Sequence, residues 1–130
     1  MSGLARGHLL VGAFTLAVFL LSGIYLRTHN PPLTQLEPGL HALFVSRHIY
    51  ILSAALLNLV VGAYLRPTAR GRRIQRVGSL LLMLGAVLLM AAFVVEPMAR
   101  RSRTPVSSFG VFALFGGSLS HVVAGVRRRD

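Results

Sequence analysis

The chain has 130 residues and a formal net charge of +11, and hydrophobic residues make up 54% of it while charged residues make up only 13%. A water-soluble domain of this length could not bury that much apolar surface, so the composition indicates a membrane protein. Cysteine is absent, which excludes disulfides, thiolate metal sites and redox thiols. All 14 basic residues are arginines, and all but Arg47 lie near the ends of apolar segments, which favours anchoring to lipid headgroups over binding of nucleic acid.

Four apolar segments follow one another, at about 8–26, 41–65, 77–95 and 106–126. Each is long enough to cross a hydrocarbon core of ~30 Å as a helix that rises ~1.5 Å per residue. The first is long for the apolar part of a signal peptide and no typical cleavage motif follows it, so we expect it to be retained. The sequence therefore predicts an all-α polytopic protein, with one four-helix transmembrane domain over 1–130 arranged up-down-up-down.

Prolines mark the connections between these segments. Asn30-Pro31-Pro32 and Pro38-Gly39 interrupt the first connection, and Arg66-Pro67 ends the second segment. Pro97 and Thr104-Pro105 bracket the third connection. We expect a helix to stop at each of these places, and we expect no broken helix because none of the span interiors contains proline.

The arginines predict an orientation. With a cytoplasmic N-terminus, the inner side holds Arg6, the five arginines of residues 66–76 and the three of 127–129, whereas the outer side holds Arg27 and the three of 100–103. The positive-inside rule then favours both termini in the cytoplasm, in a bacterial-type inner membrane, with arginine-rich loops at its surface. The bilayer is the first expected partner, and other membrane subunits or a second copy are the next.

Small residues recur at helical spacing and predict where the helices meet. Without a hydrophobic force between helices in lipid, packing relies on close approach across small side chains and on interhelical hydrogen bonds. The first segment carries Gly12 on the same face as His8 and Thr15. The full set of expected packing glycines is Gly12, Gly78, Gly85, Gly110, Gly117 and Gly125.

Three ionisable residues define a polar cluster expected in the outer leaflet. Arg47 and His48 lie six to seven residues inside the second segment, and Glu96 ends the third, antiparallel segment at a similar depth. A charge in hydrocarbon costs at least ~2.5–3.5 kcal/mol, so we expect an Arg47–Glu96 ion pair with His48 beside it. A structural clasp and a proton-active or ligand-binding site both remain open. His41 is about 10 Å of helical rise from His48, so no metal site of His41, His48 and Glu96 is expected.

A second polar level is expected near the inner face, where His8, Asn58 and His121 reach similar depths. Two histidines on inward faces are suitable axial ligands for a b-type haem, but the signal is weak, and a headgroup position for His8 with hydrogen bonding of His121 is the favoured explanation. We assign no cofactor and keep haem b as the alternative.

No motif for phosphate, nucleotide or acyl chemistry occurs in the chain. The sequence therefore favours a non-enzymatic accessory, assembly or scaffold subunit of a larger membrane complex. The alternative is a haem- or quinone-binding electron-transfer component, or a proton-coupled transport component, that uses the intramembrane Arg, His and Glu residues. The substrate, the partner and the oligomeric state are not predicted.

Overall fold

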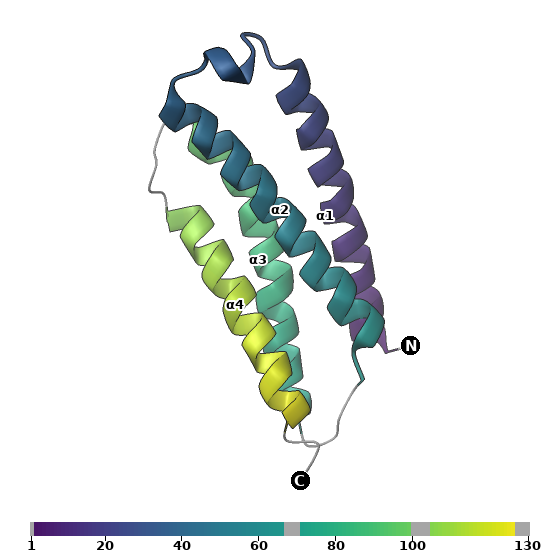
Figure 1. The fold of residues 1–130 in the computed structure, drawn as a ribbon. Coiled ribbons are helices and arrows are strands. Elements are labelled where there is room, and N and C mark those ends of the chain that lie inside the picture. The colour runs from purple at the N-terminus through teal and green to yellow at the C-terminus, as the bar shows by residue number, and fades with distance from the viewer. Residues whose placement is uncertain (1, 67–70, 100–104, 127–130) are drawn as a thin grey trace.

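The computed structural model describes residues 2–66, 71–99 and 105–126. They form four long helices, α1 (Gly3–Thr28), α2 (Pro38–Tyr64), α3 (Arg72–Met98) and α4 (Pro105–Val126), and the short 3₁₀ helix η1 (Leu33–Gln35). All four long helices are long and apolar enough to cross a membrane, and they pack in sequence as an up-down bundle (Figure 1). The predicted polytopic four-helix fold is thus confirmed. The predicted connections at 67–70 and 100–104 and the last arginines, 127–129, lie outside the described residues.

The helices begin and end for identifiable reasons. Ser2 is the N-cap of α1, where its hydroxyl accepts a hydrogen bond from the backbone N–H of Ala5 at 3.2 Å. Pro38 stands in the first turn of α2, a position where its missing N–H costs nothing. The expected stop at Pro97 is displaced by one residue, because α3 continues through Pro97 and ends at Met98. In the last turn, Pro97 removes only one intrahelical hydrogen bond, and Ala99 N–H still donates to the carbonyl of Val95.

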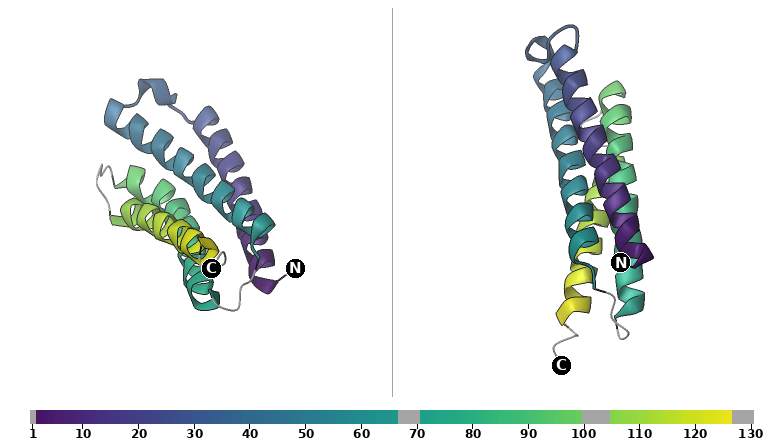
Figure 2. Two further views of the ribbon diagram at one scale, coloured as in Figure 1. Left: turned by 60° about the horizontal axis from the view of Figure 1, so that its bottom comes forward. Right: turned by 90° about the vertical axis from the view of Figure 1, so that its right-hand side faces the viewer.

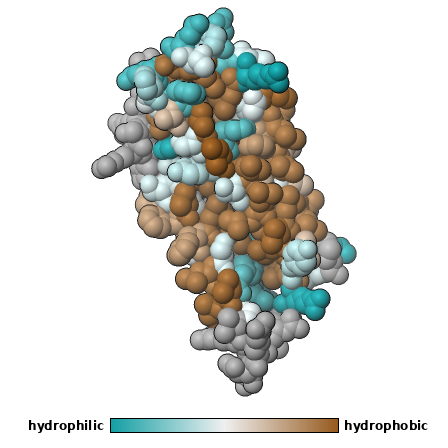
Figure 3. Space-filling model, in the orientation of Figure 1, coloured by the Kyte–Doolittle hydropathy of each residue, from teal (hydrophilic) through white to brown (hydrophobic). Residues whose placement is uncertain are grey.

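The bundle consists of two hairpins. α1 packs along α2, α3 packs along α4, and the α2/α3 contact joins the pairs, so α1 and α4 lie on opposite sides for most of their length (Figures 1 and 2). The first residues of α1 and the last residues of α4 lie at one end of the bundle, the terminal end, and residues 29–37 lie at the other, the loop end. Apolar residues dominate the middle of the molecule in Figure 3, with hydrophilic residues toward its two ends.

Two apolar clusters fill the interior. The larger is made of small and aliphatic residues of α2, α3 and α4, namely Ala54, Leu82, Ala86, Leu89 and Leu114. The other lies toward the loop end and is built on Phe44, Ile51 and Phe93. Polar groups are buried beside both clusters, and since backbone and side-chain polar groups find no water in hydrocarbon, their partners must come from the protein.

Candidate functional site

The first candidate site is the Arg47 cluster, formed by Arg47, Glu96, Ser46, Tyr50 and Ser107. The guanidinium of Arg47 on α2 makes a direct ion pair with Glu96 on α3 through Nε and Oε2, as the sequence predicts. Glu96 is fully buried, and Arg47 is 8% exposed. A charge pair at this depth satisfies two groups that would each be costly alone.

The N-terminus of α4 completes this cluster. The backbone N–H of Ser107 donates to Glu96 Oε1 at 2.8 Å, and Arg47 Nη2 donates to the Ser107 hydroxyl at 3.3 Å. Arg47 Nη1 also donates to Ser46 Oγ at 2.8 Å, and the Arg47 guanidinium carbon lies 5.7 Å from the centre of the Tyr50 ring. Three helices are therefore joined through one carboxylate.

Sequence reasoning missed Ser107, although a signal for it exists. Pro105 opens α4, so the amide of Ser107 falls in the first turn, where backbone N–H groups have no intrahelical acceptor. Those free N–H groups and the helix dipole favour a carboxylate at this point. A buried glutamate just before a proline-initiated helix therefore indicates a helix N-terminus as its partner.

His48 does not belong to the Arg47 cluster, and the prediction that places it beside the ion pair is wrong. Its Nδ1 lies 2.9 Å from Ser22 Oγ on α1, and its ring stacks on Phe19 with the ring centres 4.2 Å apart. Ser22 already donates its hydroxyl hydrogen to the carbonyl of Phe19, so His48 is the donor to Ser22. Neighbouring residues of a helix point about 100° apart, so Arg47 directed at α3 and α4 leaves His48 directed at α1.

The histidine cluster, formed by His8, Asn58, Ser79 and His121, lies toward the terminal end. His8 Nδ1 lies 2.8 Å from Asn58 Oδ1, and the Asn58 amide nitrogen donates to the carbonyls of Ala54 at 2.9 Å and Leu82 at 3.3 Å. His121 Nε2 lies 3.2 Å from Ser79 Oγ. His8 and His121 are in edge contact, with ring centres 5.9 Å apart. The structure thus brings together the three residues expected at the inner level and adds Ser79.

The geometry of this cluster does not fit haem. If His8 and His121 were the two axial ligands of a haem, the porphyrin macrocycle would lie between their rings, and it is several times wider than an imidazole. Asn58 and Ser79 lie directly against these rings, and the helices around them approach backbone to backbone: a Cβ on Gly12 would lie 2.9 Å from the backbone nitrogen of Leu59. A porphyrin would have to force these helices apart, so the haem alternative receives no support from the packing.

The predicted packing glycines divide into two groups. A Cβ would come within 3.0 Å of a neighbouring helix at five of them, namely Gly12, Gly78, Gly85, Gly110 and Gly117. Gly125 differs, because it is exposed and a Cβ there would meet nothing within 4 Å. Among the described residues, no neighbour therefore supports the packing role expected for Gly125. The helical period of small residues continues to Gly125, but this glycine lies at the end of α4, where no described residue comes within 4 Å of the added atom.

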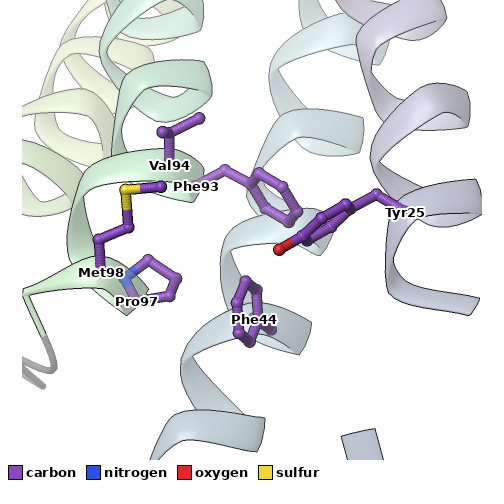
Figure 4. Close-up of a pocket in the computed structure, with 6 residues that line it drawn as sticks. All are labelled: Tyr25, Phe44, Phe93, Val94, Pro97 and Met98. Atoms are coloured by element: carbon purple, nitrogen blue, oxygen red, sulfur yellow. The ribbon is translucent and has the colours of Figure 1, made fainter. Parts of the chain in front are cut away.

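An aromatic pocket opens near the loop end, with a cavity volume of about 250 Å³. Tyr25 of α1 points toward Phe44 of α2 and Phe93 of α3, and the last turn of α3 closes the other side (Figure 4). The three ring centres lie 6.0 to 6.3 Å apart. The lining residues are Tyr25, Phe44, Phe93, Val94, Pro97 and Met98. No pattern in the sequence indicates this pocket, because its lining residues come from three helices and share no local motif.

Comparisons of the chain with protein families, with curated proteins and with solved structures find no match.

Proposed function

We propose that this protein is a non-enzymatic subunit that acts by association within the membrane, as an accessory, assembly or scaffold component of a larger complex. The observation that supports this proposal best is a mid-span apolar groove between α3 and α4. It has a volume of about 510 Å³, and the exposed rings of Phe109 and Phe112 form its rim. Its full lining is Leu81, Leu84, Leu88, Phe109, Phe112 and Ala113.

The groove suits a helix of another chain. Ridges of side chains on one helix pack into the grooves of the next, and aromatic residues at a protein surface contribute large contact areas at low entropic cost. Phe115, one turn further along α4, is also 69% exposed and extends the aromatic row. The Arg47 cluster supports the same proposal, because both oxygens of Glu96 are used in joining helices.

Site-specific photo-crosslinking in living cells tests this function. A photoreactive residue at Phe112 should yield one discrete protein adduct, either with another membrane protein or with a second copy of the chain. The matched control is Leu10, which is 72% exposed on α1, on the opposite side of the bundle. Adducts with lipid alone at both positions would contradict the proposal.

The membrane and the orientation form part of the same proposal. We infer a bacterial-type inner membrane with both termini in the cytoplasm, which rests on the arginine distribution and agrees with the start of α1 and the end of α4 at one end of the bundle. Reporter fusions at Arg73 and Arg129 should both give a cytoplasmic signal. A periplasmic signal at Arg73 would reverse the orientation.

A second candidate function is the binding of an apolar ring, such as a quinone headgroup, in the aromatic pocket. Three aromatic side chains and one hydroxyl surround a half-enclosed space, which is the usual character of a small-ligand site. A short-chain quinone titrated into the purified protein should quench tyrosine fluorescence. The Phe93→Ala variant should weaken this binding and Phe112→Ala should leave it unchanged, whereas equal effects of the two substitutions would reject the pocket.

A further inference from the structure

The imidazole of His8 has one nitrogen whose role the fold leaves unexplained. His8 is fully buried, and among the described residues no hydrogen-bond partner contacts its Nε2. Buried polar atoms in proteins are nearly always paired, so such an atom indicates a missing partner. We propose that His8 and His121 together bind a single copper(I) ion at the terminal end of the bundle, where α1 and α4 meet.

The hydrogen bonds of Asn58 determine which His8 nitrogen is available. The Asn58 amide nitrogen donates to two backbone carbonyls, those of Ala54 and Leu82, so its Oδ1 is the atom that faces His8. Since this oxygen only accepts, His8 Nδ1 carries the hydrogen of their 2.8 Å contact. Neutral His8 therefore presents a lone pair at Nε2. Metal-binding histidines are usually oriented in this way, with the second ring N–H donated to an oxygen.

His121 provides the second nitrogen. Its Nε2 lies against Ser79, and its Cδ2 would lie 3.3 Å from a Cβ on Gly78, so this edge of the ring faces α3. Nδ1 is on the other edge and is the nitrogen that we assign to the ion. Ser79 is fully buried and fixes the ring, in the same way that Asn58 fixes His8.

The distance between the rings fits a shared ion. With metal–nitrogen bonds of about 2.0–2.1 Å, each imidazole centre lies about 3.2 Å from a bound metal. The two ring centres are 5.9 Å apart, which corresponds to an angle of about 135° at the metal, between trigonal and linear. The separation of the two ring centres therefore falls in the range that a shared ion requires.

Copper(I) suits these ligands better than other ions do. The described residues contain no group of three or more His, Cys, Asp or Glu side chains that could hold a metal, so a four-ligand zinc site or a carboxylate-rich calcium site has no basis there. Imidazole is a good ligand for copper, and copper(I) is stable with two or three ligands. A single positive charge is also less costly to bury than a double one, and imidazole is a neutral donor, of which the His8 ring is fully buried.

Copper binding can be tested on the full chain, purified without a histidine tag in detergent micelles under reducing, anaerobic conditions. Copper(I) is added in competition with a colorimetric copper(I) chelator, and zinc(II) is tested in parallel. We expect one copper(I) per chain and weaker zinc(II) binding. His8→Gln and His121→Gln should each lower the copper affinity by about 100-fold or more, and Asn58→Ala by about 10-fold, because it acts only through the orientation of His8.

The matched control is His29→Gln, since His29 lies at the loop end and its Nδ1 contacts the carbonyl of Pro31. This variant should bind copper like the wild type. If His8→Gln does not fold, the copper affinity of His121→Gln and the X-ray absorption spectrum of the copper-loaded wild type test the proposal instead. The spectrum should show only nitrogen ligands at about 2 Å from the copper. Absence of stoichiometric copper, sulfur ligation, preference for zinc(II), or full binding by His121→Gln would each overturn the proposal.

Discussion

The two ends of the bundle hold their helices together by different means. Toward the loop end, the rings of Tyr25, Phe44 and Phe93 fill the space between α1, α2 and α3, and a pocket remains beside them. Toward the terminal end, glycines let backbones approach: a Cβ on Gly117 would lie 2.8 Å from the carbonyl oxygen of Gly78. The polar groups differ in the same way, with an ion pair in the first region and neutral side chains in the second.

This difference shows what each kind of contact contributes in a bundle that lies in lipid. Where small residues allow close approach, packing and weak neutral hydrogen bonds are sufficient. Toward the loop end, where aromatic rings lie between α1, α2 and α3, the polar connection is charged, and Arg47 reaches both α3 and α4 from α2. A buried ion pair adds little net stability over a well-packed apolar core, but it is very costly to break.

Breaking the ion pair should have the largest effect. Glu96→Gln or Arg47→Gln leaves one buried charge without its counterion, so each should lower the free energy of unfolding by roughly 3–5 kcal/mol. The double substitution removes both charges and should recover much of this loss. Reversible unfolding of the purified variants in mixed micelles measures all three values.

A control for the ion pair is Arg27→Gln, which removes an exposed arginine at the end of α1 and should leave stability unchanged. If the double variant is as unstable as the sum of the two single variants, the two side chains act independently and the clasp interpretation fails. A stable double variant that no longer supports the protein's activity in cells would instead indicate that the pair has a functional role.

Close backbone approach at the terminal end should show the next largest effect. A methyl group at Gly117 would overlap the backbone of α3, so Gly117→Ala should destabilise the bundle by about 1–3 kcal/mol, the usual cost of overpacking. Gly116→Ala is a matched control in the same turn, because its nearest neighbour, Leu81 Cδ1, would lie 3.7 Å away. The control should be neutral or slightly stabilising, as alanine is the better helix former. Equal losses in both variants would show that the α3/α4 contact is looser than the structure describes.

Much of this arrangement could be predicted from the sequence, because depth in a membrane can be counted along a helix. The spans follow from hydropathy and length, and the number of residues from each helix end places Arg47 and Glu96 at a similar level. The high cost of a lone charge in lipid then predicts the pair, which the structure contains. The same counting places His8, Asn58 and His121 together.

Direction around a helix, and contacts among three helices, could not be predicted in this way. The side-chain direction of His48 depends on how α2 is rotated, and one residue of difference turns it from the ion pair to Ser22. Ser107 takes part through its backbone N–H, which its residue type does not reveal. The aromatic pocket forms between three helices, and the angles between these helices depend on the packing of the whole bundle.

The neutral contacts of the histidine cluster should give the smallest effects. Asn58→Ala removes hydrogen bonds to His8 and to the carbonyls of Ala54 and Leu82, and His8→Ala removes only the first of these. Intramembrane hydrogen bonds contribute ~0.6–2 kcal/mol, so in metal-free protein each variant should lose about this much, with Asn58→Ala the more destabilised. The double variant should lose less than the sum of the single losses, because the two residues share one bond. A loss in metal-free His8→Ala as large as that of Glu96→Gln would contradict the contrast between the two ends, since it would mean that the neutral end depends on its polar groups as strongly as the charged end does.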